Sequence, residues 1–141
     1  MNESLHHLLM TDHLLFQKAL LAGIRETGLT LGQPKVLDYL LTHDGAIQRE
    51  IAEACHIEPA TITSLLAGME KKGLIVRQNQ QGNRRSLFVY LTENGKKMAM
   101  EVDRAFQCIE KQALTGFDQE EAAALADFLA RVNENMKGLA L

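Results

Sequence analysis

The sequence predicts a mainly α-helical protein with a small β-hairpin, organised as a winged helix-turn-helix with further helices on both sides. Three observations predict this fold. Two short amphipathic segments meet at a tight break near the middle of the chain. Two apolar strands with a polar loop between them follow directly, and longer segments with helical spacing of apolar residues lie before and after this region.

The segments before the centre are predicted helices. Residues 3–26 keep a helical stripe of leucines that is wider than a single surface helix needs, and Gly28 ends it. A second helix opens at Gln33-Pro34, with the proline in its first turn, and continues through Leu41.

The central pair of helices forms the helix-turn-helix. The first runs from about Ile47 to Cys55, and the chain breaks at 56–58. The second begins at Pro59, which suits the first position of a helix, and continues to Gly73, which suits its end.

After this glycine the apolar period changes from that of a helix to that of a strand. Residues 74–77 and 86–91 are predicted strands, joined into a hairpin by the polar run 78-QNQQGNRR-85. Thr92 can cap a helix over about 93–114 through its hydroxyl. A capping-box-like start at 118–121 opens a last helix.

Composition and motifs narrow the class of function. The chain is 46% hydrophobic and 23% charged, and its apolar runs are interrupted too often for a membrane span. The N-terminus does not resemble a signal peptide, and two cysteines do not make a disulfide framework, so we expect a cytoplasmic protein with no membrane partner. The sequence has no Gly-rich phosphate loop and no nucleophile elbow, so we expect no enzyme and no cofactor.

Positive charge is concentrated in one segment, although the whole chain has a net charge of −3. Residues 59–97 carry seven Lys or Arg against two Asp or Glu, while 1–58 and 98–141 each carry four against eight. A basic segment between acidic flanks is typical of a surface that contacts phosphates. Chance clustering of solvated lysines would give the same count, so charge alone leaves both interpretations open.

The helix that begins at Pro59 is predicted to present small and hydroxyl side chains to a partner, opposite its core-facing stripe of Ile62, Leu65, Leu66 and Met69. Hydroxyls bind base edges or phosphates, and small side chains let a helix approach the floor of the major groove. On this helix we predict contacts to double-stranded DNA from Ala60, Thr61, Thr63, Ser64 and Lys71. Ala67 and Gly68 are expected on the same exposed side, where a glycine favours close approach to a partner.

Arg84 and Arg85 lie at the tip of the predicted hairpin. With the preceding helix in the major groove, this tip falls beside the neighbouring minor groove, where flat and weakly hydrated guanidinium groups fit well. We therefore predict that both arginines contact DNA. The alternatives are a solvated turn and a winged helix used for protein–protein contacts.

The helices outside the winged helix carry more apolar surface than it can cover. We therefore expect a homodimer in which terminal helices of two chains pack together as one intertwined domain. In this organisation residues 1–28 form an N-terminal dimerisation helix, 29–97 the DNA-binding winged helix-turn-helix, and 98–141 the C-terminal dimerisation helices.

The ordered runs LTLGQPKVLDYL, QREIAEACHIEPATITSLLAGMEKKGLIVR and GNRRSLFVYLTENG resemble the MarR family of transcriptional regulators. The resemblance spans Leu29 to Lys97, and the helices on both sides match the family's layout. It implies an obligate dimer that binds a pseudo-palindromic operator and usually represses. It also implies release by a small aromatic or phenolic ligand, an oxidant or a metal.

Three positions depart from the family pattern. Asn83 stands where the family has an aspartate that pairs with the arginine at position 85, so that ion pair is missing. Ile47 stands where the family usually has Thr or Ser, which leaves Asp44 as a candidate cap for the following helix. Ala67-Gly68 stands where the family often has polar or basic residues.

The family layout also implies where a switch would act. A small-molecule pocket would form where the first, second and post-wing helices meet, near Phe16, Val36, Tyr39, Met98 and Met100. A thiol-redox switch at Cys55 or Cys108 is the alternative, although neither has basic neighbours in sequence that would depress its pKa. Because the chain has no histidine after residue 56, we expect no metal site.

Overall fold

The computed structural model describes residues 3–80 and 82–139, with the backbone but not the side chains of residues 83–85. The chain divides into two compact units, Met1–Gln107 and Cys108–Leu141. Across the described residues, no helix combines the length and the apolar character that crossing a membrane requires.

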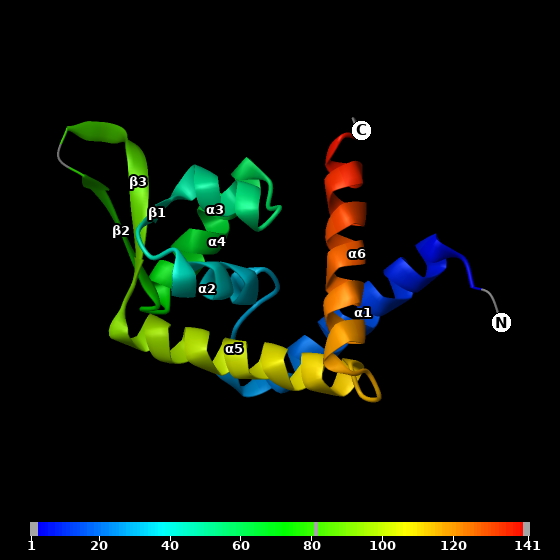
Figure 1. The fold of residues 1–141 in the computed structure, drawn as a ribbon. Helices are drawn as coiled ribbons and strands as arrows, with labels where there is room; N and C mark the ends of the chain where they lie inside the picture. Colours follow the sequence, from blue (N-terminus) through cyan, green and yellow to red (C-terminus); the bar gives the residue numbers. More distant parts are fainter. Residues whose placement is uncertain (1–2, 81, 140–141) are drawn as a thin grey trace. The chain divides into compact units, whose positions relative to one another are not determined.

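The fold is mainly helical with one small antiparallel sheet, as the sequence predicts (Figure 1). The helices are α1 (Leu5–Gly23), the 3₁₀ helix η1 (Arg25–Thr27), α2 (Gln33–Thr42), α3 (Gln48–Ala54), α4 (Pro59–Lys71), α5 (Glu93–Ala113) and α6 (Gln119–Lys137). The strands are β1 (Ala46–Ile47), β2 (Ile75–Gln80) and β3 (Asn83–Leu91). The first unit contains every element up to most of α5, and α6 belongs to the second.

The sheet has the order β1-β3-β2, with both strand pairs antiparallel. β2 and β3 form the predicted hairpin, in which Ile75 lies opposite Leu91 and the register shifts between Asn79 and Gln80. β1 has no counterpart in the sequence-based prediction, because a strand of two residues is too short to show alternation. By pairing with β3, β1 attaches the chain just before the helix-turn-helix to the hairpin.

One hydrophobic core holds the winged helix together. Figure 1 shows the short helices α2, α3 and α4 beside the sheet. Burying one Leu, Ile, Val or Met side chain stabilises a fold by roughly 1.5–3 kcal/mol. The largest fully buried side chains are Val36, Leu37, Leu40, Ile51, Ile62, Leu66, Met69, Ile75, Val89 and Val102. They come from α2, α3, α4, both long strands and α5, so the core fixes α4 relative to the hairpin.

The corner between α4, β3 and α5 is closed by Thr92 and Gly95. The Thr92 hydroxyl accepts a hydrogen bond from Gly95 N at 3.0 Å, which confirms the predicted cap of α5. The same hydroxyl donates to the carbonyl oxygen of Gly73 at 2.6 Å. A Cβ built on Gly95 would overlap the carbonyl oxygen of Leu74, so the first turn of α5 lies directly on the chain that leaves α4.

The expectation that Asp44 caps α3 is wrong. Ile47 occupies the N-cap position of α3, and no side chain caps that helix. The Asp44 carboxylate instead accepts a hydrogen bond from Leu91 N at 2.8 Å. It therefore fixes the turn before β1 to the end of β3, a long-range contact that local sequence rules do not reveal.

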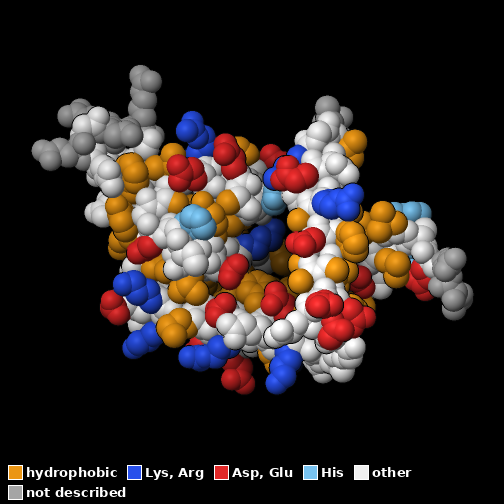
Figure 2. All heavy atoms as spheres, in the orientation of Figure 1, with side chains coloured by type: hydrophobic (Ala, Val, Ile, Leu, Met, Phe, Trp, Pro, Cys, Tyr) orange, Lys and Arg blue, Asp and Glu red, His pale blue; other side chains and the backbone are white. Residues whose placement is uncertain are grey.

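The outer helices expose large apolar side chains along much of their length. In the first unit, α1 has no buried residue, and six of its side chains are between 42% and 69% exposed: Leu5, Leu8, Met10, Leu14, Leu15 and Leu21. In the second unit, α6 exposes Leu125, Phe128, Leu129 and Met136 by 38% to 58%. Figure 2 shows hydrophobic side chains on the surface of both helices.

α6 begins with the capping box that its sequence predicts. Glu121 N donates to the Asp118 carboxylate at 2.8 Å, and Asp118 N donates to the Glu121 carboxylate at 3.0 Å. This reciprocal pair is the predicted capping box. It shows that α6 begins for local reasons, independently of what its apolar side packs against.

Candidate nucleic-acid interface

α4 begins and ends where its sequence predicts. Pro59 occupies the first turn, where its missing N–H removes no helical hydrogen bond. Gly73 follows the helix with a φ of 76°, which a residue with a side chain rarely adopts. Ile62, Leu66 and Met69 are buried in the core, so the opposite side of the helix faces away from the protein.

That outer side carries the residues predicted to contact DNA. Ala60, Thr61, Thr63, Ser64 and Lys71 are all exposed. The Ser64 hydroxyl donates to the carbonyl oxygen of Thr61 at 3.1 Å, which leaves its oxygen able to accept from a partner. The structure thus brings these five residues together on one accessible helix, while their contact with DNA stays a prediction.

Ala67 and Gly68 are less exposed than predicted. Both are half-buried, and a Cβ on Gly68 would lie 3.4 Å from the side-chain nitrogen of Gln33 in α2. Gly68 therefore lies beside α2 as well as on α4, and its close approach to an outside partner stays a prediction.

The same region ties the end of α4 to the loop before α2. Gln33 is only 3% exposed, and its side-chain oxygen accepts from Thr30 N at 3.1 Å and from the Lys72 amine at 2.8 Å. The Lys72 amine also donates to the carbonyl oxygen of Gly28 at 2.8 Å. Lys72 therefore contributes to the positive charge counted in 59–97, but its amine is bonded within the protein.

At the tip of the wing the structure describes the backbone from residue 82 onward but not the side chains of residues 83–85. β3 begins at Asn83, so Arg84 and Arg85 belong to a strand that pairs with β2. Their side chains and that of Asn83 lie outside the described residues. The predicted DNA contacts of the two arginines, and the effect of Asn83 in place of an aspartate, therefore remain predictions.

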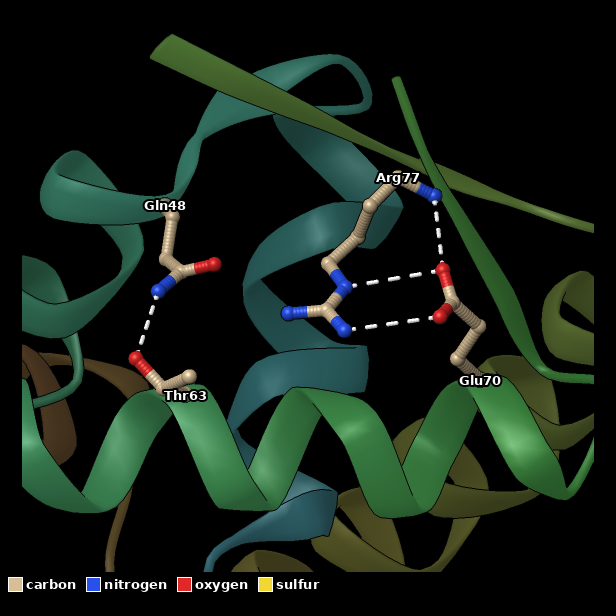
Figure 3. A network of polar contacts seen from close by, with 4 residues as sticks. All are labelled: Gln48, Thr63, Glu70 and Arg77. Carbon is tan, nitrogen blue, oxygen red and sulfur yellow. Dashed lines mark hydrogen bonds and ion pairs between the residues drawn. The ribbon is translucent and has the colours of Figure 1, made fainter. Parts of the chain in front are cut away.

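An ion pair joins α4 to the base of the wing (Figure 3). The Arg77 guanidinium in β2 donates to both carboxylate oxygens of Glu70, at 3.5 Å from Nε and 3.4 Å from Nη2. Arg77 N donates to the same carboxylate at 3.2 Å. These hydrogen bonds from Arg77 lower the pKa of Glu70. Arg77 is therefore a brace between helix and wing.

A second polar contact lies at the other end of the outer side of α4. The Gln48 amide nitrogen, at the start of α3, donates to the Thr63 hydroxyl at 2.9 Å (Figure 3). Sequence reasoning missed both Gln48 and the pairing of Arg77 with Glu70. A glutamine at the first position of a short helix carries no periodic signal, and the pairing depends on the hairpin folding back onto α4.

Comparisons with known proteins agree with this geometry. A family model described as the MarR family matches residues 29–87. The HTH-type transcriptional repressor MdtR of Bacillus subtilis (strain 168) is 30% identical over 121 residues, which cover 84% of this chain and 78% of MdtR. The chain belongs to the MarR family. It is a DNA-binding transcriptional regulator with the winged-helix fold.

Solved structures of other regulators superimpose on nearly the whole MarR-family chain. The transcriptional regulator SlyA aligns with a TM-score of 0.84 and 29% identity, over 96% of this chain and 94% of SlyA. A MarR family transcriptional regulator from Listeria monocytogenes, complexed with 26mer DNA, aligns with a TM-score of 0.86 and 25% identity, over 96% and 90% of the two chains. The predicted family and fold class are therefore confirmed.

A small cavity of about 120 Å³ lies between α1 and α2 of this MarR-family chain. It is lined by His13, Phe16, Gln17, Leu20, Leu21, Leu31, Gly32, Pro34 and Lys35. Of the five predicted pocket residues, Phe16 alone is among those lining it, and the Phe16 ring stacks on that of Phe106 in α5 at 5.9 Å between centroids.

The other four predicted pocket residues lie elsewhere. Val36 is fully buried in the core, and Met98 is half-buried against it. The Tyr39 ring stacks on His43 with 4.2 Å between ring centroids. Met100 is 51% exposed. The structure therefore does not bring these four side chains together with Phe16 around the 120 Å³ cavity.

The two cysteines of the MarR-family chain differ in environment. Cys55 is buried, and this burial raises the pKa of its thiol despite the nearby Lys35 amine. A raised pKa leaves little reactive thiolate at neutral pH. Cys108 is exposed on α5. Among residues 3–80 and 82–139, no group of three or more His, Cys, Asp or Glu side chains is placed to hold a metal ion.

Proposed function

We propose that this MarR-family regulator is a cytoplasmic repressor that binds a pseudo-palindromic operator as a homodimer and is released by a small aromatic or phenolic ligand. The observation that carries the proposal is the outer side of α4, where small and hydroxyl side chains face away from the core. Two polar contacts join α4 to its neighbours: the Gln48–Thr63 hydrogen bond and the Arg77–Glu70 ion pair. The naming of MdtR as a repressor and the Listeria monocytogenes complex with DNA support it.

In this proposal α4 enters the major groove and reads bases through Ala60, Thr61, Thr63 and Ser64. The helix has 13 residues and is about 20 Å long, which suits a groove about 12 Å wide entered at an angle. Lys71 lies at the end of the exposed side and would contact a phosphate. The wing would place Arg84 and Arg85 at the neighbouring minor groove.

The homodimer is supported by the apolar surfaces of α1 and α6. Each helix exposes several large hydrophobic side chains, and such patches on a soluble domain usually mark a protein interface. A second copy of the same chain supplies matching surfaces, because symmetric dimers bury the same patch from both subunits. Dimerisation would also match the two halves of a pseudo-palindromic operator.

The ligand is supported by the cavity between α1 and α2. Its volume of about 120 Å³ is close to the roughly 150 Å³ of an apolar cavity that admits benzene, so it suits a single small ring. Its lining is mostly apolar, with His13, Gln17 and Lys35 as polar groups that could orient a hydroxyl or carboxylate. Because Cys55 is buried with a raised pKa, a thiol switch there is the less favoured alternative.

The wing is tested by replacing Arg84 and Arg85 together with alanine and measuring affinity for the DNA upstream of the protein's own gene over a range of salt concentrations. Removing two guanidinium groups that neutralise phosphates should weaken binding to specific and unrelated duplexes alike. The slope of log affinity against log salt should fall by about 1 for each phosphate that the protein no longer neutralises.

The matched control replaces Lys111 and Lys137, which removes the same charge from α5 and α6, outside the proposed interface. It should keep the salt slope of the unmodified protein. A double wing variant that binds with unchanged slope would show that the wing does not contact DNA. A chain that binds no duplex at all would favour a winged helix used for protein contacts.

A further inference from the structure

Gln48 and Thr63 join the two helices of the helix-turn-helix at the exposed side of α4. The Gln48 amide nitrogen donates to the Thr63 hydroxyl at 2.9 Å. Gln48 is half-buried, whereas Thr63 is exposed on the side proposed to enter the major groove. Gln48 is thus placed to control how Thr63 presents its hydroxyl, without itself belonging to the predicted DNA contacts.

The hydrogen bond limits what Thr63 can offer to a base. A threonine hydroxyl has one hydrogen to donate and two lone pairs that accept. Gln48 occupies one lone pair, and the hydroxyl also lies 3.5 Å from the carbonyl oxygen of Pro59, toward which its hydrogen can point. What remains is one accepting lone pair and the γ-methyl group. Thr63 therefore presents an acceptor beside a methyl group.

The two ends of the Gln48 amide differ in their surroundings. Figure 3 shows the amide nitrogen directed at Thr63, to which it donates. Among the described residues the amide oxygen is buried and has no hydrogen-bond partner. The opposite orientation would place the NH₂ group at this buried position, which would leave two donor hydrogens unpaired instead of one acceptor.

We propose that Gln48 is a positioning residue that fixes the Thr63 hydroxyl as an acceptor, so that Thr63 selects an A·T base pair. In the major groove adenine offers the N6 amino group as a donor, and its paired thymine offers a methyl group for apolar contact. Guanine offers acceptors at N7 and O6, which an accepting hydroxyl does not match. Cytosine offers its N4 amino group as a donor but has no methyl group, so the apolar contact of the Thr63 γ-methyl with thymine is what separates an A·T pair from a pair read through cytosine. This inference rests on the proposed function, because it requires α4 to enter the major groove.

The test starts from a duplex that the unmodified full-length protein selects from a random-sequence library. Every base pair of one half-site is then replaced in turn, and affinities are measured at one fixed salt concentration. Thr63→Val keeps the methyl group and removes the hydroxyl. It should lower the preference for A·T at one position by roughly tenfold and leave the other positions unchanged.

Gln48→Met keeps the approximate length of the side chain and removes the donor. It should lower the preference at that same position several-fold, and the Gln48→Met/Thr63→Val double variant should behave like Thr63→Val alone. Gln48→Ala, compared at the same position, serves as a second variant if Gln48→Met does not fold. A purely structural role of Gln48 would weaken binding to all duplexes equally, and that result would overturn the proposal.

The outcomes separate the proposal from the function on which it rests. If no duplex is enriched by selection, the proposed function fails. If Thr63→Val changes a preference that Gln48→Met leaves intact, the function stands and the positioning role is wrong. If the affected position prefers G·C, or if Thr63→Val changes no preference, the assignment of Thr63 to an A·T pair is overturned.

Discussion

Gly95 is the residue in the first turn of α5 that has the least room for change. A Cβ at this position would overlap the backbone carbonyl of Leu74, which cannot move aside as a flexible side chain could. The hydroxyl of Thr92, which bonds both Gly95 N and the carbonyl oxygen of Gly73, fixes the same corner from the other side. The requirement for glycine here is thus a matter of space.

Gly95→Ala should therefore lower the free energy of unfolding by about 1–3 kcal/mol or more, because the added methyl group must displace backbone. Chemical denaturation of the full chain measures this change. Gly23→Ala is the matched control, since its Cβ would lie at an ordinary 3.7 Å from that of Ala105. Equal stability of the two variants would show that the corner can relax without cost.

At the level of the helices and strands, the sequence predicted what depends on local pattern. The stripe of Ile62 and Leu66, with Pro59 before it, was enough to place α4, and Thr92 was enough to cap α5. β1 was missed because pairing with β3 makes it a strand. The half-burial of Gly68 was not predicted, because its neighbour Gln33 is far from it in sequence.

For the candidate site, too, the sequence predicted the features that depend on local spacing and missed those that depend on contacts between elements. The exposure of Thr63 and Ser64 on α4 followed from helical spacing. The partners that orient these groups did not, because Gln48 and Arg77 reach α4 only after α3 and the hairpin have packed. Side-chain hydrogen bonds between different elements produce no periodic pattern in a sequence. The contacts of Gln48 and Arg77 with α4 could therefore be found only from the structure.

Asp38 in α2 and Asp103 in α5 provide a test with pH. Partial burial, and secondarily the negative charge of Asp103, raises the pKa of Asp38 above its ordinary value of 3.8. Between pH 3.8, the ordinary pKa, and the raised pKa of Asp38, the folded state binds more protons than the unfolded state. The free energy of unfolding therefore falls as the pH rises through this range. At neutral pH, where Asp38 is ionised, this penalty is fully present.

Asp38→Asn should remove that penalty. We expect a small gain in unfolding free energy at neutral pH, less than about 1 kcal/mol because the side chain is largely at the surface. The fall in stability above pH 3.8 should also become shallower. Thermal unfolding measured from acid to neutral pH tests both, with Asp127→Asn on α6 as a control of equal charge change. A loss of stability at neutral pH would contradict the expectation.

For the whole molecule, charge and apolar surface are distributed over different parts of the chain. Only 59–97 carries an excess of positive over negative charge, whereas α1 and α6 each expose several large hydrophobic side chains. A MarR-family regulator needs both kinds of surface, one to bind phosphates and one to bind its second copy, if the proposed dimer is correct. The division suits an assembly in which the outer helices are covered and the winged helix stays accessible.

Light scattering should therefore give a mass of twice 15.7 kDa for the unmodified chain. Phe128→Asp, which places a charge on the apolar side of α6 at a residue 58% exposed in the single chain, should shift the protein toward monomer. Val76→Asp, at a residue 46% exposed on β2, should not. An unmodified chain that is monomeric at micromolar concentration would refute the dimer.

The close packing at Thr92 and Gly95 couples the position of α4 to that of α5. Since backbone packs against backbone there, we expect a rotation of the first turns of α5 to displace the chain that leaves α4, and α4 with it. α4 is 13 residues long, so turning it by about 10° about one end would move the other end by about 3 Å. That distance is comparable to the length of a hydrogen bond, enough to separate a side chain from a base.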